Sequence, residues 1–311
     1  MQTYIASLQF SEEQMKTMEG KFFSSATMRI FTHDVDVVRP DGEILCKFRK
    51  HRLGVKDTEA LLQIQTAAKL GRTRPNASGI PPEGKYKYIV SKSSGKPLHV
   101  LTTTSRSGIV GFYDTTSNFG YHHSANGNNA NNPSHTNANA KAPVKDATAT
   151  MKQQQTPQCR MTAYTAKFLE RYKTCVAVFS KVSRLFKSLV PKRYKAQQLA
   201  VREISDEYVI PGTVFTTVTV NKNFRTALHK DSGDYEQGFG MMTVASVGEY
   251  GGGYTLFPQY GVGIDCQGGD VLAMDVHQWH CNSEMTGTGT RISYVFYVRE
   301  KMQKSCPSLK T

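Results

Sequence analysis

Short β-rich runs, separated by turn residues, fill the last third of the chain and constrain its fold more than any other feature. Residues 212–220 read GTVFTTVTV and residues 291–299 read RISYVFYVR, and similar runs occupy 240–247, 253–257 and 270–275. Gly, Asp or Asn residues separate these runs, and helical signals are few. Short strands of this kind predict an all-β sandwich or barrel.

The segment before this region has a helical pattern and a strongly basic face. Apolar residues recur at three- and four-residue steps between 161 and 204, and Pro191 starts a second helical segment. The segment 158–204 contains eleven Lys or Arg and only two Glu, in a chain whose net charge is +14. A charge run is usually a solvated helix face, but one of a single sign favours a polyanionic partner. DNA bound by the basic segment 160–202 is therefore the first partner to expect, and RNA stays an alternative.

The N-terminal third mixes helices and strands. Ser11 and Gln14 have the spacing of a capping box and predict a short helix that stops near Gly20. RPDGE, between the β-rich runs 27–38 and 44–49, predicts a hairpin. A further helix is expected from Asp57 to Gly71. Three short strands are expected after it, at 86–90, 98–103 and 109–113.

Composition divides the chain into three parts. From Asn118 to about Thr156, Asn, Ala, Thr, Ser and Gln replace nearly all large apolar residues. Such a stretch buries too little surface to offset its ordering entropy. We expect N-terminal α/β elements over 1–116 packed on the core, a flexible Asn-rich insertion over 117–157, and helices followed by the β core over 158–311.

Cysteine usage and hydropathy indicate an intracellular protein without a membrane partner. The six cysteines are scattered without a CxxC pair, and we expect them to be reduced thiols. Neither an apolar run of membrane-spanning length nor a signal-peptide pattern is present in the sequence.

Three residues in the β region suggest a metal site. His229 and Asp231 form an H-x-D pair, and His280 follows in DVHQWHCN. Residues two apart on a strand point to the same face, so both side chains of the pair can reach one ion while a distant strand supplies the third ligand. Two imidazoles and one carboxylate suit Fe(II) and leave one face of the ion open. H-x-D alone is weak, because its commonest meaning is a surface polar pair.

A group of polar residues near the C-terminal end of the β region strengthens the prediction of a metal site. Arg291 begins R-I-S, so Ser293 lies on the same strand face as the guanidinium. An Arg beside a hydroxyl matches a carboxylate such as the distal one of 2-oxoglutarate. Asn221 or Asn223 could hydrogen-bond the proximal carboxylate, although Asn is also common at strand ends. Together these patterns indicate an iron and 2-oxoglutarate centre.

The segment from Gly212 to Val298 resembles the TET/JBP family of iron- and 2-oxoglutarate-dependent nucleic-acid base dioxygenases. The resemblance is carried by FTTVTVNKNFRTALHKDSGD, GGGYTLFPQYGVG, GDVLAMDVHQWHCN and RISYVFY. DVDVVRPDGEILCKFRK, SGIVGFYD and PQCRMTAYT extend it upstream, toward the JBP-like and viral branch. The chain shows neither the cysteine-rich zinc-binding extension of the animal 5-methylcytosine oxidases nor a base-J-binding domain, which leaves the substrate base open.

The resemblance implies an α+β fold with a double-stranded β-helix (jelly-roll) core and supporting helices. It implies His229, Asp231 and His280 as iron ligands and Arg291 as the 2-oxoglutarate anchor. His277 competes for the third ligand position, but the order W-H-C-N followed by an Arg is the one this class uses. Fe(II), 2-oxoglutarate and O2 are then required, with ascorbate as reductant. A nuclear or viral setting follows from the family only.

The function that these inferences favour is hydroxylation of the methyl group of thymine or 5-methylcytosine in DNA. A target base inside a duplex must be extruded into the pocket. Aromatic residues at 239, 254, 260 and 279 are candidates for stacking on it, although each has the profile of a core residue. Two alternatives remain: a prolyl or lysyl protein hydroxylase on the same iron site, and a catalytically inactive nucleic-acid-binding jelly-roll. The basic segment argues against the first, and the complete ligand set argues against the second.

Overall fold

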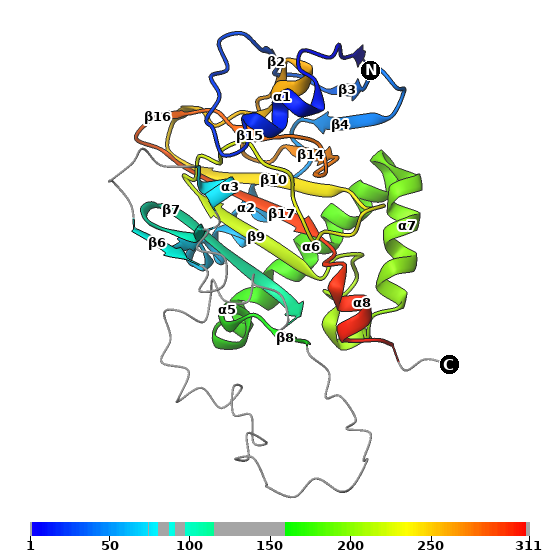
Figure 1. Ribbon diagram of the computed structural model, residues 1–311. Coiled ribbons are helices and arrows are strands. Elements are labelled where there is room, and N and C mark those ends of the chain that lie inside the picture. Colours follow the sequence, from blue (N-terminus) through cyan, green and yellow to red (C-terminus); the bar gives the residue numbers. More distant parts are fainter. Residues whose placement is uncertain (1, 74, 80–86, 91–96, 115–158, 309–311) are drawn as a thin grey trace, which may run out of the picture.

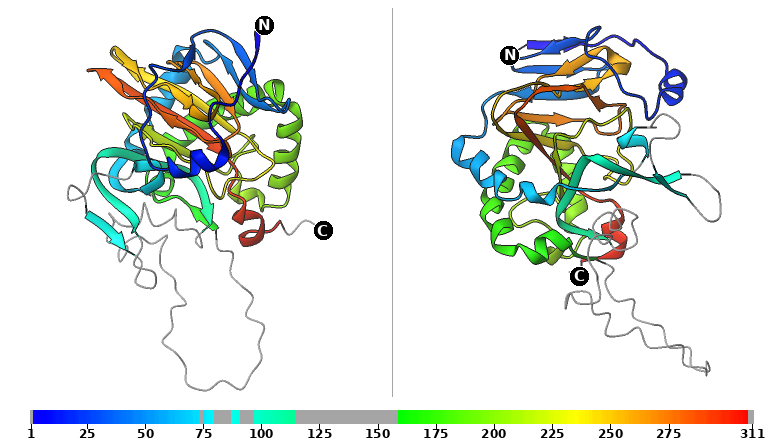
Figure 2. Two further views of the ribbon diagram at one scale, coloured as in Figure 1. Left: turned by 45° about the horizontal axis from the view of Figure 1, so that its top comes forward. Right: turned by 90° about the vertical axis from the view of Figure 1, so that its left-hand side faces the viewer.

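Two β-sheets face each other, and helices cover the outer face of the larger sheet (Figure 1; Figure 2). The computed structural model describes residues 2–73, 75–79, 87–90, 97–114 and 159–308. The expected Asn-rich insertion, 117–157, lies outside these residues. Among the described helices, none is long and apolar enough to cross a bilayer.

The larger sheet has the strand order β1-β3-β4-β14-β10-β17-β9-β7-β5, with β6 and β8 also paired to β7. All of its pairs are antiparallel except β1 with β3. Its strands are β1 (Gln2–Ile5), β3 (Val35–Val38), β4 (Ile44–Arg49), β5 (Lys69–Thr73), β6 (Lys87–Val90), β7 (Pro97–Asp114), β8 (Cys159–Met161), β9 (Thr217–Lys222), β10 (Gly240–Val247), β14 (Val271–Met274) and β17 (Thr290–Tyr297).

The smaller sheet has the order β15-β12-β13-β2. A separate two-stranded ribbon is formed by β11, which precedes β12 in the chain, and β16, which follows β15. These strands are β2 (Arg29–Phe31), β11 (Tyr250–Gly252), β12 (Thr255–Phe257), β13 (Val262–Ile264), β15 (Cys281–Asn282) and β16 (Met285–Gly287). Phe257, Val262 and Ile264 from the smaller sheet share an apolar cluster with Met242 and Val244 from the larger. Two sheets packed in this way confirm the double-stranded β-helix core.

The alternation of side chains along β17 separates two environments. Ile292, Tyr294 and Phe296 join the apolar cluster that also contains the helix residues Phe179 and Phe186. The residues between them point to the other side of the sheet, because successive strand residues face opposite ways. Val295 accordingly packs on the cluster between the two sheets. Arg291 and Ser293 therefore face the space between the sheets, on the side away from the helices.

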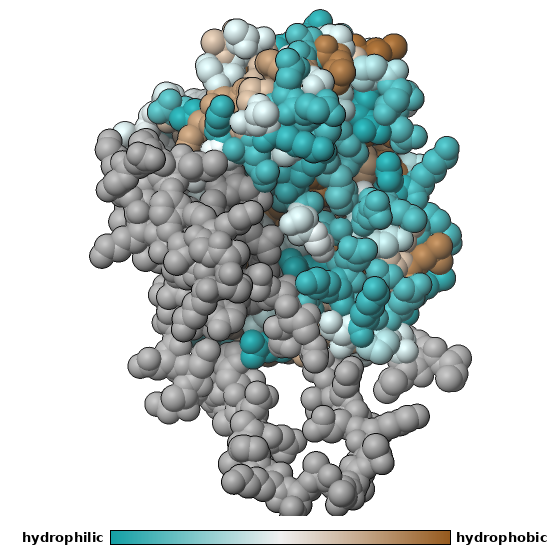
Figure 3. Space-filling view, in the orientation of Figure 1, coloured by the Kyte–Doolittle hydropathy of each residue, from teal (hydrophilic) through white to brown (hydrophobic). Residues whose placement is uncertain are grey.

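The helices of the basic segment cover that outer face. They are α5 (Ala163–Lys167), α6 (Leu169–Leu189) and α7 (Pro191–Arg202). On the apolar stripe of α6, Phe179, Val182 and Phe186 are fully buried, as their three- and four-residue spacing predicted. The other apolar residues of the stripe are half-buried (Val176, Leu185 and Leu189). Arg184 and Lys187 lie exposed on the solvent side of α6. Figure 3 shows a largely hydrophilic surface over α7, at the right of the view. The basic face is thus directed away from the space between the sheets.

Local signals in the N-terminal third are confirmed at the first helix and the hairpin. The remaining helices are α1 (Glu12–Thr17), α2 (Val55–Leu62), α3 (Pro75–Ser78) and α8 (Lys301–Ser305), with 3-10 turns at Gln65–Ala67, Asp206–Tyr208 and Pro258–Tyr260. Ser11 and Gln14 form both bonds of the capping box of α1. The strands β3 and β4 pair antiparallel on either side of RPDGE.

The helix expected over 57–71 is wrong at its C-terminal end. The α2 helix stops at Leu62, and Lys69–Thr73 forms β5 instead, paired with β7. Two of the three strands expected at 86–113 are one long strand, β7. Strand pairing with a distant segment outweighed the local periodicity in both places. Strands from before residue 117 extend both sheets, so this part of the chain completes the core as well as packing on it.

The expectation that all six cysteines are reduced thiols is wrong for one pair. Cys159 on β8 and Cys306 after α8 form a disulfide, with their Cα atoms 5.9 Å apart. Cys46, Cys175, Cys266 and Cys281 are free and buried. The two bonded residues are 147 positions apart in sequence, so only the tertiary fold brings them together.

Candidate metal centre

His229, Asp231 and His280 meet at a point where two extended segments pair. His229 and Asp231 lie between β9 and β10, outside the regular strands in which the H-x-D pair was expected. Backbone bonds of 3.0 Å join His229 and His280 in both directions, and a third of the same length runs from the Asp231 N–H to the Val276 carbonyl. The segment is therefore extended enough for His229 and Asp231 to point the same way, as in a strand.

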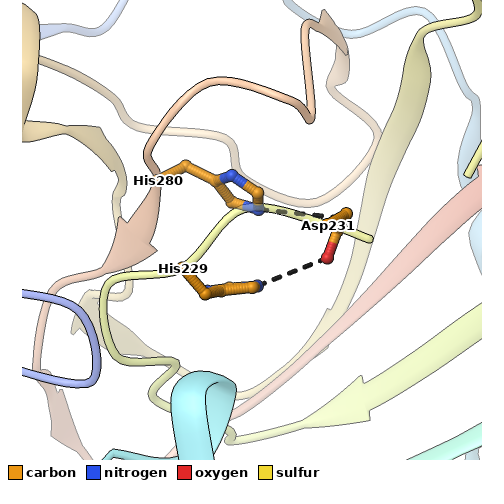
Figure 4. A group of neighbouring side chains, drawn as sticks. All are labelled: His229, Asp231 and His280. Atoms are coloured by element: carbon orange, nitrogen blue, oxygen red, sulfur yellow. Dashed lines mark ion pairs between the residues drawn. The ribbon is translucent and has the colours of Figure 1, made fainter. Parts of the chain in front are cut away.

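The three side chains converge closely enough to hold one ion. Their ligand atoms lie within 4.8 Å of one another. Nε2 of His229 is 3.5 Å from Oδ1 of Asp231, and Nε2 of His280 is 3.8 Å from Oδ2 of the same carboxylate (Figure 4). The two imidazole ring centroids are 4.4 Å apart. Among the residues that the structure describes, this is the one group of three or more His, Cys, Asp or Glu side chains in such an arrangement.

Backbone carbonyls fix the orientation of both imidazoles. Nδ1 of His229 lies 2.7 Å from the Ala227 carbonyl oxygen, and Nδ1 of His280 lies 2.9 Å from that of Gln278. A carbonyl can only accept, so each Nδ1 carries the proton and each Nε2 presents a lone pair to the centre of the group. Metal-binding histidines are commonly held in this way by a second hydrogen bond.

Electrostatics favour the ligand form at His280 and Asp231, whereas at His229 burial is outweighed by the contact with Asp231, which raises the pKa, so that a metal must displace a proton there. Burial together with the neighbouring His229 lowers the pKa of His280 to about 4. Burial works against ionisation of Asp231, but the contact with His229 and the nearby imidazoles lower its pKa to about 2. At neutral pH the group therefore contains a carboxylate and a neutral imidazole at His280, both of which are ligand forms.

The site is open on one side. The His229 and His280 side chains are buried, whereas about a third of the Asp231 side chain is exposed (32%). Two imidazole nitrogens and a carboxylate on one face of an ion, with open positions opposite, form the arrangement typical of ferrous oxygenases. The donor set and its orientation thus fit Fe(II).

A buried cationic cradle accompanies this group. Arg291 is 4% exposed, and its Nε and Nη2 have no hydrogen-bond partner in the described structure. The hydroxyl of Tyr250, buried and likewise without a partner, lies close to that guanidinium. Burial raises the pKa of Tyr250 to about 12, and the charge of Arg291 opposes the rise, so the phenol is a neutral donor. Unpaired buried donors side by side fit an anion such as a carboxylate.

Glycine backbone makes room for the cradle. Gly253 has φ +67°, and a Cβ there would lie 3.0 Å from Cδ of Arg291. Gly252, at φ +71°, would place a Cβ against the Glu284 carbonyl. The GGGY run therefore lets the backbone approach Arg291. Tyr250, just before this run, was missed because one Tyr among fifteen carries no local signal.

Ser293 and Asn221 lie beside the cradle on the same face of the sheet. They are direct partners in the register of β17 and β9, and Ser293 is buried. The side-chain oxygen of Asn221 is buried without a partner. Asn223 has a different role, because its Oδ1 accepts the Arg291 N–H at 2.7 Å and its φ is +46°. It is a strand-end residue.

The other candidates are not members of the metal group. His277 pairs with Asp275, with 3.4 Å between Nδ1 and Oδ1. Phe239, Tyr260 and Trp279 belong to the buried apolar clusters, and Tyr254 is half-buried. Phe239, Tyr260 and Trp279 are therefore core residues, which removes them as stacking platforms.

Comparison with known families identifies the C-terminal half of the chain. Residues 149–300 match the Tet_JBP family, described as the oxygenase domain of the 2OGFeDO superfamily. His229, Asp231, His280 and Arg291 all lie within the matched residues.

Curated relatives match a stretch of similar length. The chain is 36% identical over 147 residues to thymine dioxygenase JBP1 of Trypanosoma brucei brucei, a match that covers 46% of this chain and 17% of the relative. It is 37% identical over 146 residues to the bifunctional helicase and thymine dioxygenase JBP2 of the same species, covering 46% and 13%. The chain thus spans less than a fifth of the length of these relatives. The resemblance expected upstream of residue 149 lies outside the family match, and the matches to these relatives cover less than half of the chain.

A solved structure extends the likeness to the fold of nearly the whole chain. NgTET1, in complex with 5mC DNA, superimposes with a TM-score of 0.50 at 15% identity, covering 96% of this chain and 90% of that one. At this identity the likeness concerns the fold. Through residues 149–300, the chain belongs to the Tet/JBP family of oxygenase domains in the iron- and 2-oxoglutarate-dependent dioxygenase superfamily.

Proposed function

We propose that this protein is an Fe(II)- and 2-oxoglutarate-dependent dioxygenase that hydroxylates the methyl group of thymine or 5-methylcytosine in DNA. One observation carries the proposal: His229, Asp231 and His280 turn their ligand atoms toward one point, with both Nδ1 atoms tied to backbone carbonyls. Such a group is prepared for a metal before the metal binds.

Each residue has a definite part in this proposal. His229, Asp231 and His280 would hold Fe(II), which with 2-oxoglutarate and O2 supplies the oxidising chemistry. Arg291 and Tyr250 would bind the distal carboxylate, because their buried polar groups lie side by side and Nε and Nη2 of Arg291 have no partner among the described residues. Ser293 and Asn221 flank this position on the same sheet face.

DNA is the proposed substrate class. The curated relatives are named thymine dioxygenases, and NgTET1 was solved with 5mC DNA. A methyl group within a duplex is reached by rotating the nucleotide out of the stack, which costs a few kcal/mol that contacts in the pocket must offset. The relatives are far longer than this chain, so the base that they oxidise cannot be assigned to it directly. The choice between thymine and 5-methylcytosine therefore needs an experiment.

We propose that segment 160–202 does not supply the phosphate contacts beside an extruded base, while its binding of the DNA backbone elsewhere stays a prediction. The helices α6 and α7 pack on the face of the larger sheet opposite to Arg291 and Ser293. Their basic residues therefore point away from the space between the sheets. Contacts to the backbone beside the extruded base would then come mainly from other residues.

The test is mass spectrometry of nucleosides after incubation with Fe(II), ascorbate and 2-oxoglutarate in air. Thymine-containing and 5-methylcytosine-containing duplexes are compared. We expect 5-hydroxymethyluracil or 5-hydroxymethylcytosine from the wild type and neither from Asp231→Ala. Asp41→Ala, which alters an exposed carboxylate in the β3–β4 hairpin, serves as the matched control.

Three results would contradict parts of the proposal. Succinate formed without either modified nucleoside would support the oxygenase activity and exclude thymine and 5-methylcytosine in DNA as its substrates. Full activity of Asp231→Ala would overturn the assignment of Asp231 as a metal ligand. The absence of succinate from iron-loaded protein would overturn the proposal that the protein is a 2-oxoglutarate-dependent dioxygenase.

A further inference from the structure

One carboxylate in the N-terminal helix touches the neighbours of all three candidate ligands. Oε1 of Glu12 accepts a hydrogen bond of 2.9 Å from Nζ of Lys230, the residue between His229 and Asp231. Oε2 of Glu12 accepts one of 3.0 Å from Nε1 of Trp279, the residue before His280. Glu12 thus bridges the two segments that carry the metal group.

The alternation of extended segments explains this geometry. His229 and Asp231 point toward the metal position, so Leu228 and Lys230 point to the opposite side. In the same way Trp279 and Cys281 point away from the side that His280 faces. Leu228, Trp279 and Cys281 form one buried cluster with Met15 of α1. The helix α1 therefore covers the back of the metal group, beside β15 (Figure 1).

The bridging carboxylate is held firmly in place. The capping box of Ser11 and Gln14 fixes the first turn of α1, in which Glu12 lies. Met15 is fully buried. After the helix, backbone bonds of 2.9 Å join Gly20 and Lys21 to Leu228. The position of Glu12 is thus set from both ends of its segment.

The two donors also contact each other. Nζ of Lys230 lies 5.0 Å from the centre of the Trp279 ring. The Glu12 and Lys230 side chains are each about one third exposed, so solvent screens their charges. The Glu12 bridge therefore acts mainly by holding the H-x-D segment in a fixed position relative to the segment that carries His280.

We propose that Glu12 is a positioning residue for the metal centre, acting through Lys230 and Trp279, and that the N-terminal helix is part of the catalytic unit. This inference rests on the proposed function. It concerns a residue outside the family match, which begins at residue 149. A domain cut at the family boundary would lack the bridge.

The experiment measures metal affinity of the full chain, with Mn(II) as a redox-stable substitute for Fe(II) in isothermal titration calorimetry. We expect Glu12→Ala to weaken Mn(II) binding about 10-fold, at the lower end of the effect of removing residues that orient metal ligands. Glu12→Gln keeps one accepting oxygen and should fall between wild type and Glu12→Ala. Glu13→Ala, an exposed neighbour whose side chain bonds Ser11, should bind as the wild type does.

A double variant separates positioning from general stability. Trp279→Phe keeps the buried ring and removes the N–H donor. If Glu12 acts through Trp279, the two substitutions remove the same interaction. The fold-loss of Mn(II) affinity in the double variant Glu12→Ala/Trp279→Phe should then be smaller than the product of the fold-losses in the two single variants. The absorption spectrum of bound Co(II) should also change in Glu12→Ala, which loss of stability alone does not produce. The melting temperature of each metal-free variant controls for folding, and Glu12→Gln serves if Glu12→Ala does not fold.

Several outcomes would overturn the inference and leave the proposed function intact. These are wild-type Mn(II) affinity in Glu12→Ala and Glu12→Gln, an unchanged Co(II) spectrum, or fully multiplicative effects in the double variant. A wild-type protein that binds no Mn(II) would instead overturn the metal centre and this inference with it.

Discussion

At the scale of single residues, the candidate site combines groups that the sequence could nominate with groups that it could not. His229, Asp231 and His280 follow a recognisable spacing and their side chains meet in the structure. Tyr250 and Glu12 carry no pattern, and only their contacts with Arg291, Lys230 and Trp279 single them out. Chemistry that depends on pairs of distant residues is therefore the part least accessible to sequence reasoning.

Tyr250→Phe tests the cradle. The change removes one buried hydroxyl and keeps the ring, so Arg291 remains as the main anion-binding group. A hydrogen bond to a charged group contributes about 1.5 kcal/mol or more, so we expect the KM for 2-oxoglutarate to rise about 10-fold or more. Succinate formation as a function of 2-oxoglutarate concentration provides the measurement.

Mn(II) affinity should stay at the wild-type value in Tyr250→Phe, because the metal ligands are untouched. Tyr208→Phe, in the 3-10 turn Asp206–Tyr208, is the matched control. An unchanged KM for 2-oxoglutarate would remove Tyr250 from the cradle.

At the scale of elements, helices are joined by a few polar contacts as well as by apolar packing. Asp57 in the first turn of α2 accepts the Gly54 N–H at 2.9 Å and the Lys181 ammonium of α6 at 2.6 Å. Burial opposes ionisation of Asp57, but these bonds and the charge of Lys181 lower its pKa. One carboxylate therefore caps α2 and ties it to α6.

Asp57→Asn keeps an oxygen that can accept the Gly54 N–H and removes the charge that faces Lys181, so we expect it to lower the free energy of unfolding at pH 7 by less than about 1 kcal/mol. The loss is small because Lys181 is more than a third exposed and its charge is screened. The pKa of Asp57 is lower in the folded state, so its contribution is complete above the unfolded value, about 3.9, and is lost as the pH falls through the folded value. Urea unfolding at pH 7 and below pH 4 measures both parts.

The exposed Glu59→Gln on the same helix provides the comparison for Asp57→Asn. A difference between Asp57→Asn and wild type that persists unchanged in acid would show that ionisation of Asp57 contributes nothing to stability.

At the scale of the whole molecule, the larger sheet separates two faces with different roles. Arg291 and Ser293 face the space between the sheets, the centre of the His280 ring lies 6.5 Å from that of Phe257 in the cluster there, and the basic helices cover the outer face. Net positive charge attracts DNA over a long range wherever it lies, but direct phosphate contacts need proximity to the bound strand. The charge of α6 and α7 is thus separated from the chemistry by the core of the protein.

Charge reversal of two exposed α6 residues tests this separation. We expect Arg184→Glu/Lys187→Glu to leave base oxidation in a hairpin duplex of about one helical turn (~10 base pairs) within twofold of wild type. The salt dependence of binding should also be unchanged, because released counterions report only phosphates in contact with the protein. A large fall in kcat/KM together with a shallower salt dependence would show that DNA reaches α6 during turnover.

The sequence by itself determined the local features: the capping box of α1, the apolar stripe of α6, the short strands of the last third and the H-x-D pair with its distal His and Arg. Each of these is recorded in the spacing of nearby residues, because side-chain periodicity reports which face of an element is buried. The tertiary structure alone decided which distant residues meet. Pairing with β7 made a strand of Lys69–Thr73, and folding joined Cys159 to Cys306. It likewise brought Glu12 behind the metal group and turned the basic helices away from it, since local spacing carries no record of the partner across the core.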